Sequence, residues 1–418
     1  MANKSRFLGW EIYLKTEEHE FDTEIVDLMI GHDIASLFPM ATIKLSIDTS
    51  FIKCFAKPHT CKLLLVNRLI YTEENSEMFE IDLQAVTNPS IIIERESDEK
   101  RSRITRITVR YMCLNGVTIV NRRVCGIYHK KKLKDIVKDL HQQTKSKLQL
   151  KFDPEIENQN EYECITIEES SFIQAIRYLH QRYGFYNNLF CTFAETFTTG
   201  GEKQWFFGNI DKLIKKRKKG SNNTKFMFAR FEEFDQPAQE PNLEERKYYI
   251  YTDVAIRNNF MQIVKRMPQM LKFFAFEENK FIKRLDVKIV DVIKQLPFLQ
   301  STEQFEKKME YGEEPYYASR FDITKYSLNH MIQDLGLTAY QMPDIIVPNP
   351  IKIEHFLVGT EMEFESKQES ISQTNDLHFW IAGFLLHIRQ GDGKSGGATW
   401  STTMKIRPVA ASPKGIKD

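Results

Sequence analysis

The sequence has no excess of charge of either sign and no long apolar run, and each absence excludes a class of protein. Its 418 residues hold 58 Lys and Arg against 57 Asp and Glu, so no net field draws the whole molecule onto nucleic acid or lipid. No run approaches the roughly 18 apolar residues of a membrane-spanning helix, and the N-terminal segment lacks the apolar core of a signal peptide. We therefore expect a cytosolic start, no membrane insertion and roughly two or three domains.

Paired cysteines are also missing. The six cysteines are scattered along the chain, at Cys54, Cys61, Cys113, Cys125, Cys164 and Cys191. None belongs to a Cys-x-x-Cys pair, which argues against both a disulfide framework and a zinc site. We expect reduced thiols, most of them buried as small apolar side chains.

Motifs for catalysis, cofactor binding and metal binding are absent as well. The ten histidines form no His-x-x-x-His arrangement, and His129, His141 and His180 are predicted on the surface beside polar neighbours. Adjacent carboxylates such as Glu168 and Glu169 point in different directions, so they are unsuited to act as a paired acid and base. The sequence therefore predicts no catalytic residue, no cofactor and no metal ligand.

One glycine-rich string, GDGKSGG at 391–397, matches two catalytic motifs in part. A phosphate-binding loop would need glycine where Ile388 stands, and a nucleophile elbow at Ser395 would need a helix after the motif. The residues that follow, ATWSTTMKI, alternate like a strand. We interpret the string as a β-turn, and an esterase-like activity at Ser395 is the third hypothesis for function.

What the sequence does contain is a succession of alternating strands, with 30 Phe and 16 Tyr to fill pleated surfaces. Residues 41–48 alternate Ile43, Leu45 and Ile47 with polar side chains, which is the period of a half-buried strand. The pattern recurs at 62–66, 78–86 and 106–114. These spacings predict an antiparallel, tube-like β-barrel domain over residues 1–126.

The pattern changes after this first domain. Residues 133–140 have helical periodicity, and NLFCTFA with KQWFFGN predicts a hairpin, so residues 127–211 are expected to form a small α/β module. A basic and polar linker follows at 212–247. Alternation returns in KYYIYTDVAIRN, IKRLDVKIVDVI, IEHFLVGTEMEF, LHFWIAGFLLHI and ATWSTTMKIRPV, which predicts a second β-barrel over 248–418. The predicted fold is mainly β with an α/β insert, and the order suggests a duplicated barrel without a residue-level repeat.

The clearest local signal lies in residues 167–186, IEESSFIQAIRYLHQRYGFY. Four large apolar residues share one helical face: Phe172, Ile176, Leu179 and Tyr183. Ser171 and Gln174 have the spacing of a capping box, and Gly184 is predicted to end the helix in the left-handed conformation. We expect the apolar face to pack the core of the α/β module.

Two basic runs raise an alternative function. HKKKLK contains Lys130–Lys132 and KLIKKRKK contains Lys215–Lys219, and clustered lysines can neutralise phosphates. Neither run has interleaved aromatic residues that would stack on bases. A solvated charged face is the simpler interpretation, and a non-specific nucleic-acid-binding module is the alternative hypothesis.

This order of elements resembles the tail hub family, which comprises the central baseplate hub of contractile phage tails and the N-terminal part of type VI secretion spike proteins. The resemblance is carried by a helix that follows a strand and lies downstream of LKDIVKDL, with Ser171, Phe172, Ile176, Leu179, Tyr183, Gly184, Phe185 and Tyr186 in the family's places. Phe356–Phe364 corresponds to a strand before a long hairpin that ends in ATWSTTMKIRPV. The chain departs from the family in lacking a C-terminal needle region and in a longer segment at 325–344.

The resemblance implies a structural, non-enzymatic homotrimer. Two similar barrels per subunit would form a pseudo-sixfold ring that joins a sixfold tail tube to a threefold central spike. The implied partners are further copies of the chain, the tail tube protein, a central spike protein on a separate chain, and other baseplate proteins. DNA would be contacted only by non-specific electrostatics, and the protein would reside in the virion after assembly in the host cytoplasm.

Overall fold

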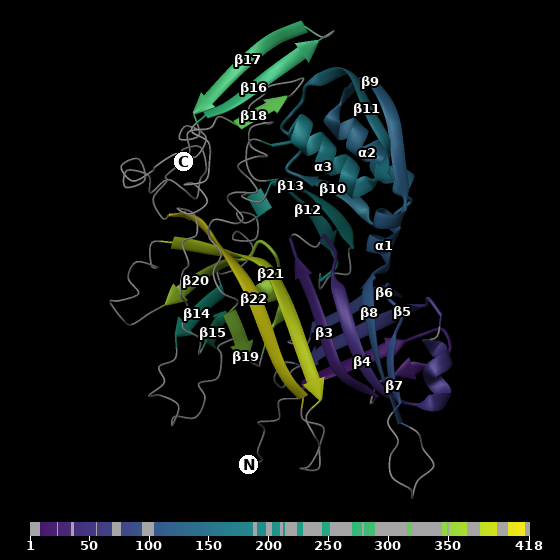
Figure 1. Ribbon diagram of the computed structural model, residues 1–418. Helices are drawn as coiled ribbons and strands as arrows, with labels where there is room; N and C mark the ends of the chain where they lie inside the picture. Colours follow the sequence, from purple (N-terminus) through teal and green to yellow (C-terminus); the bar gives the residue numbers. More distant parts are fainter. Residues whose placement is uncertain are drawn as a thin grey trace, which may run out of the picture.

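Strands dominate the computed structural model of the chain (Figure 1). The structure describes residues 9–22, 24–34, 37–55, 57–68, 77–93, 104–186, 190–197, 203–209, 212–213, 224–228, 245–250, 270–277, 280–288, 316–319, 345–348, 351–365, 377–390 and 400–413. Most strands within these ranges pair with antiparallel neighbours, and a small group of helices lies, in sequence, between the early and the late strands. The predicted fold class, mainly β with an α/β insert, is confirmed.

The largest sheet has 14 strands and contains both ends of the described chain. Its early strands are β1 (Gly9–Lys15), β2 (Glu20–Phe21), β3 (Ile25–Asp33), β4 (Met40–Asp48), β5 (Thr60–Arg68), β6 (Glu77–Ala85), β7 (Ser90–Ile93) and β8 (Ile104–Cys113). Its late strands are β14 (Thr224–Phe228), β15 (Lys247–Ile250), β19 (Ile345–Pro348), β20 (Glu361–Glu365), β21 (Leu377–Gln390) and β22 (Trp400–Pro413). We call these two sets the first half and the second half of the sheet.

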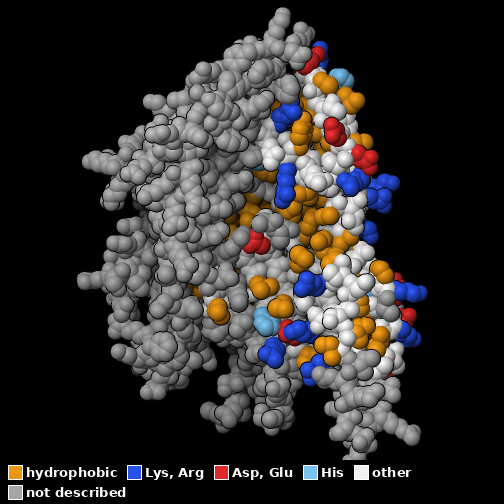
Figure 2. Space-filling model, viewed as in Figure 1, with side chains coloured by type: hydrophobic (Ala, Val, Ile, Leu, Met, Phe, Trp, Pro, Cys, Tyr) orange, Lys and Arg blue, Asp and Glu red, His pale blue; other side chains and the backbone are white. Residues whose placement is uncertain are grey.

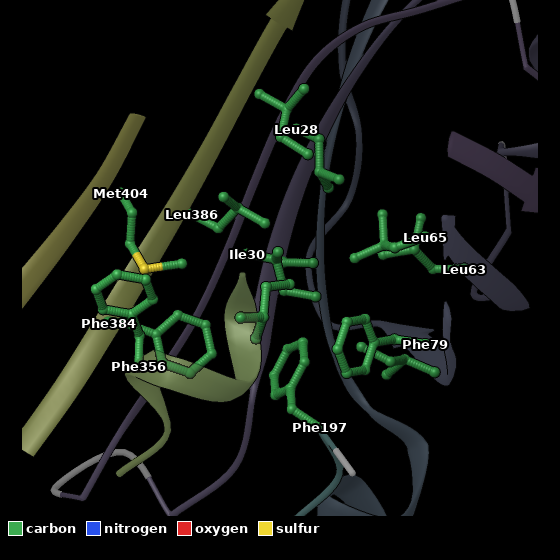
Figure 3. Close-up of a cluster of buried hydrophobic side chains, with 14 of the residues drawn as sticks. Leu28, Ile30, Leu63, Leu65, Phe79, Phe197, Phe356, Phe384, Leu386 and Met404 are labelled. Atoms are coloured by element: carbon green, nitrogen blue, oxygen red, sulfur yellow. The ribbon is translucent and has the colours of Figure 1, made fainter. Parts of the chain in front are cut away.

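Sequence alternation explains how these strands bury one face. In β4, Ile43 and Leu45 are fully buried, whereas Lys44 between them is exposed. The strands predicted at 41–48, 62–66, 78–86 and 106–114 correspond to β4, β5, β6 and β8, with ends that differ by at most two residues. Figure 3 shows the core that results, in which side chains from both halves of the sheet meet.

The two halves share an order of elements. In the first half, β4 is followed by a 3-10 helix, η1 (Thr49–Cys54), and then by β5, β6 and β8. In the second half, β19 is followed by a 3-10 helix, η5 (Ile353–Phe356), and then by β20, β21 and β22. The lateral orders also correspond, because β4-β8-β6-β5 and β19-β22-β21-β20 are each runs of antiparallel neighbours. The halves differ in the length of individual pairings.

The helices belong to a module between the two halves. Its elements are α1 (Leu114–Asn121), β9 (Arg123–Lys132), α2 (Leu133–Thr144), β10 (Gln149–Asp153), β11 (Glu161–Ser171), α3 (Phe172–Arg182), β12 (Phe190–Glu195) and β13 (Gln204–Asn209). Strands β9 and β11 form a two-stranded ribbon, and β10, β13 and β12 form a three-stranded sheet. A single apolar core contains side chains from both sheets and from all three helices. The predicted amphipathic helix at 133–140 and the predicted hairpin are confirmed as α2 and as β12 with β13.

Helix α3 begins and ends as the sequence predicted. The Ser171 hydroxyl accepts a hydrogen bond from the Gln174 amide at 3.3 Å, and the Gln174 side chain accepts one from the Ser171 amide at 3.0 Å. Gly184 follows the helix with a φ of 68°, in the left-handed region. The four predicted apolar residues are all buried in the core of the module. The capping box and the glycine stop are therefore confirmed.

A close approach of backbones fixes β10 against β13. These strands pair in parallel, with Asp153 opposite Gly208. A Cβ atom added at Gly208 would lie 2.0 Å from the Asp153 carbonyl oxygen, which belongs to the backbone and cannot rotate away. Only glycine fits at this position without moving one of the two strands.

Three features differ from the sequence-based predictions. Residues 114–121, expected within a β domain, form helix α1. Phe356–Phe364, expected as one strand, contains the end of η5, a turn with Gly359 at a φ of 87°, and only then the start of β20. Of the stretch predicted at 282–293, residues 282–288 lie in β17 (Lys280–Lys288), and residues 289–293 lie outside the described residues. Strand β17 pairs with β16 (Met270–Glu277) in a separate three-stranded sheet that also holds β18 (Tyr316–Ser319). Alternation marks a strand, but it does not specify the sheet to which the strand belongs.

None of the helices in the described part of the chain is long and apolar enough to cross a membrane.

Candidate functional site

The candidate site is the junction at which the two halves of the sheet pair with each other. Strand β3 pairs with β21 in antiparallel register, from Asp33 opposite Gly383 to Asp27 opposite Arg389. Gly31 allows this approach, because a Cβ atom there would lie 2.8 Å from the Phe384 carbonyl oxygen. The two halves are thus joined edge to edge by backbone hydrogen bonds rather than by a flexible contact.

Apolar side chains continue across this junction. Leu28 and Ile30 of β3 are fully buried, as is Leu386 of β21, and all three belong to one core (Figure 3). Phe197, which follows β12, lies 5.7 Å from the ring of Phe79 and 5.2 Å from the ring of Phe384. One side chain of the module therefore contacts the first and second halves of the sheet together.

The opposite face of the junction is polar. The Asp27 carboxylate accepts a hydrogen bond from Lys44 Nζ at 3.0 Å and contacts His387 Nε2 at 3.0 Å. This group spans three neighbouring strands, since Asp27 lies on β3, Lys44 on β4 and His387 on β21. Figure 2 shows apolar, basic and acidic side chains intermixed over the described part of the side of the molecule that is in view. The face therefore presents no field of a single sign.

A buried carboxylate forms a second connection between the halves. Glu77, at the start of β6, is 2% exposed and accepts hydrogen bonds from the amides of Ile353 at 2.9 Å and Glu354 at 3.0 Å. These amides open the 3-10 helix η5, so the carboxylate caps a helix in the other half of the sheet. The Asn67 side chain donates to Glu77 at 2.9 Å and to the Ile351 carbonyl at 2.7 Å. We call Glu77, Asn67 and the capped residues 351–354 the η5 anchor.

Burial shifts the pKa values of two side chains at the η5 anchor. Burial raises the pKa of the Glu77 carboxyl, and the hydrogen bonds from the Glu354 and Ile353 amides and from Asn67 oppose that rise. Next to it, burial lowers the pKa of His355, whose Nδ1 lies 2.8 Å from the Tyr248 hydroxyl. Each of these side chains has a hydrogen-bond partner, which is the condition for burying it without a large cost in stability.

The structure places the predicted basic residues apart from the junction. Lys130–Lys132 lie on β9, where Lys132 is opposite Glu161 of β11 and Lys130 is 4.0 Å from Glu163. Carboxylates on the paired strand thus partly balance this run, which weakens its attraction for phosphates. Lys215–Lys219, the glycine-rich string and Ser395 lie outside the described residues.

Two predictions about individual side chains need correction. His141 and His180, expected on the surface, are buried at 7% and 8% exposure in the module, whereas His129 is exposed. The six cysteines form no disulfide, but Cys125 and Cys164 are exposed on the β9–β11 ribbon and only three of the six are buried. The two histidines are buried because each directly follows a leucine that helical periodicity places inward, Leu140 or Leu179, and so lies at the edge of the same apolar face. Among the described residues, no group of three or more His, Cys, Asp or Glu could hold a metal ion.

Sequence reasoning missed the η5 anchor, although a signal was available. Glu77 occupies the same face of its strand as Phe79, Ile81 and Leu83, all of which point into the core. Asn67 likewise lies on the same face of its strand as the buried residues Leu63 and Leu65. A charged or amide side chain at an inward position of an alternating strand must find buried partners. The register of alternation could therefore have marked both residues, although not their partners.

Part of the chain matches a known protein family. Residues 67–197 match the family described as Bacteriophage PBS1 gene 109 protein. A comparison of the whole sequence with curated proteins found no match.

Several solved structures have a similar fold. The tail protein from Neisseria meningitidis MC58 has a TM-score of 0.58 at 12% identity, with 96% of each chain covered. The 43 kDa tail protein of prophage MuSo2 from Shewanella oneidensis has a TM-score of 0.54 at 10% identity, covering 96% of this chain and 98% of that one. A chain of the Francisella PdpA-VgrG complex, half-lidded, has a TM-score of 0.55 at 9% identity, covering 98% of this chain and 59% of that one. The chain therefore has the fold of phage tail proteins and of a PdpA-VgrG component, and the resemblance to the tail hub family is confirmed at the level of the fold.

Proposed function

We propose that this chain is a structural hub protein of a contractile injection machine, in which three copies form a pseudo-sixfold ring between the tail tube and the central spike. The observation that carries the proposal is the fold, which matches tail proteins over 96% of the chain. The likeness to a chain of the PdpA-VgrG complex supports a place next to a spike. The proposed role is mechanical, and it requires no active site.

The internal correspondence of the two halves supports the proposed symmetry. Three chains that each carry two similar units present six similar units around one axis, which is the requirement for contacting a sixfold tube. The strand orders β4-β8-β6-β5 and β19-β22-β21-β20 provide such a pair of units. On this proposal, the first and second halves of the sheet are the tube-like domains predicted at 1–126 and 248–418, and the module from α1 to β13 lies between them. The boundaries differ from the predicted ones, because residues 114–126 belong to the module and β14, within the predicted linker 212–247, belongs to the second half of the sheet.

The contacts between the two halves of the sheet suit a ring that must keep its shape under force. The β3–β21 pairing, the Phe197 contacts and the η5 anchor hold the two halves in one fixed arrangement. Backbone pairing and a hydrogen-bonded buried polar network favour one geometry over alternatives. We propose that this rigidity keeps the two tube-like domains in the relative orientation that a ring requires.

The proposed partners follow from this role. They are two further copies of the chain, a tail tube protein, a central spike protein on a separate chain and other baseplate proteins. The site of action is the virion, after assembly in the host cytoplasm. The balanced charges around Lys130–Lys132 give no support to the alternative of non-specific nucleic-acid binding.

The test is to measure the mass of the purified chain by light scattering, alone and mixed with the tube protein and the spike protein of the same injection machine. We expect three chain masses alone, and a larger complex with each partner. Electron microscopy of the complex should show a threefold particle with six similar outer units. A chain that stays monomeric at every concentration and binds neither partner would contradict the proposal.

A further inference from the structure

His355 lies within the contact between the two halves of the sheet. It is 2% exposed and belongs to η5, whose first amides bind the Glu77 carboxylate of the first half. From the second half, the Thr224 hydroxyl of β14 donates to the His355 carbonyl at 2.8 Å, and the ring of Tyr248 in β15 lies 6.0 Å from the imidazole. A change at this imidazole therefore acts on elements of both halves.

The hydrogen bonds around His355 determine which of its ring nitrogens carries a hydrogen. The Tyr248 hydroxyl lies 3.4 Å from the Lys352 amide and 2.8 Å from Nδ1 of His355. An amide N–H can only donate, so the hydroxyl accepts from Lys352 and directs its own proton to Nδ1. Nδ1 is therefore an unprotonated acceptor, and the hydrogen of the neutral imidazole is on Nε2. Nε2 faces the Glu354 carboxylate at 3.6 Å.

A second proton on His355 disrupts this arrangement. It would have to bind Nδ1, since Nε2 already carries a hydrogen, and Nδ1 would change from an acceptor into a donor. The Tyr248 hydroxyl could accept from the charged ring, but its own proton would lose its acceptor while the side chain is fully buried. Protonation thus breaks a buried hydrogen bond and places a positive charge in the interior.

The charged groups that face the imidazole act in opposite directions. Burial lowers the pKa of His355, the Glu354 carboxylate raises it, and the positive charges of Arg246 and Lys352 lower it. Glu77, the charged group of the first half at this contact, binds the amides that precede His355 in η5. The net shift of the His355 pKa is downward, in agreement with the acceptor role of Nδ1.

We propose that protonation of His355 opens the η5 anchor, so that acid loosens the contact between the two halves of the sheet. At neutral pH the imidazole accepts from Tyr248, and η5 stays bound to Glu77. Once the ring takes up a proton from solvent, the bond from Tyr248 breaks, and the charged ring is more stable in water than in the interior. The contact lies within a single chain, so the proposal holds whether or not copies of the chain form a ring.

The direction of the pH effect separates His355 from Glu77. The folded pKa of His355 is lowered, so its contribution to stability is full above its ordinary pKa of 6.5 and is lost as the pH falls below that value. The folded pKa of Glu77 is raised by burial, so a falling pH favours the folded state at that group. Loosening in acid is therefore the effect expected of His355 and the opposite of the effect expected of Glu77.

The test is native-state hydrogen exchange of the full-length chain at pH 7 and pH 5, corrected for the intrinsic pH dependence of exchange and followed in a peptide spanning 351–358. In the wild type we expect exchange up to about 30-fold faster at pH 5, because a histidine with an ordinary pKa of 6.5 is then about 30 times more often charged than neutral. His355→Asn cannot take up a proton but keeps an acceptor oxygen at the place of Nδ1, so its corrected rate should not rise in acid. His129→Asn is the control, because His129 is exposed on β9 and its loss should leave the acceleration unchanged.

NMR of the wild-type chain with isotope-labelled histidine provides a readout that does not depend on the stability of a variant. At neutral pH the imidazole signal that His355→Asn lacks should show a hydrogen on Nε2 and none on Nδ1. A hydrogen on Nδ1 at neutral pH overturns the proposal. Equal corrected rates at pH 7 and pH 5 in the wild type, or the same acceleration in His355→Asn, overturn it as well, and each of these results leaves the proposed hub intact.

Discussion

Removal of the Glu77 carboxylate tests whether a single buried group connects the two halves of the sheet. In the variant Glu77→Ala, three donors lose their acceptor together: the amides of Ile353 and Glu354, and the side chain of Asn67. Each buried donor left unsatisfied costs about 1–3 kcal/mol. The lower end of that range, summed over three donors, is about 3 kcal/mol.

This loss should appear first at η5, where the capped amides lie. A local free energy of opening that falls by about 3 kcal/mol speeds exchange by roughly 100-fold, since about 1.4 kcal/mol corresponds to a factor of ten. Native-state hydrogen exchange followed by mass spectrometry of a peptide spanning 351–358 measures this rate. Glu77→Gln should have an intermediate effect, because its amide keeps one acceptor oxygen but turns an N–H donor toward the η5 amides.

The matched control is Glu80→Gln on the same strand. The Glu80 side chain is 53% exposed and pairs with Lys62 at 2.9 Å on the surface. Exposed ion pairs of this kind contribute little to stability, so exchange at 351–358 should not change. If Glu77→Ala exchanges at the rate of the control, the carboxylate does not hold η5, and the η5 anchor is not a joint between the halves.

Three further predictions concern the module. Burial lowers the pKa of His141 to about 4 from an ordinary 6.5, so the folded state favours the neutral imidazole, and its contribution to stability should be lost as the pH falls from 6.5 to 4. Urea unfolding at both pH values should show that the free energy of unfolding falls by up to about 3 kcal/mol more in the wild type than in His141→Gln. Gly208→Ala should lower the free energy of unfolding by about 3 kcal/mol, because the added methyl group meets a backbone carbonyl. The control Gly126→Ala should lower it less, because there the methyl group meets only a tyrosine ring that can move, and equal losses would refute this contrast. Ser171→Ala should remove about 1 kcal/mol through loss of the α3 cap, measured as a lower thermal midpoint, and no change would mean that Gln174 alone suffices.

Local features of the chain were predictable because they depend on residues close together in the sequence. The capping residues, the apolar face and the final glycine of α3 lie within one segment, and they specify its start, its buried side and its end. The period of two in β4 likewise assigns each side chain to one face of the strand. Helix α1 was missed because its run Val117–Val120 is rich in β-branched residues, which favour strands, and its packing in the module overrode that preference.

Tertiary structure alone decided which strands became neighbours. A period of two says nothing about lateral partners, so the β3–β21 pairing could not be read from alternation. The partner of Glu77 lies 276 residues away, beyond any local pattern. The sequence by itself therefore determined the elements, their buried faces and the inward position of Glu77. The folded chain determined how two corresponding halves join, because lateral pairing depends on contacts between segments that only folding brings together.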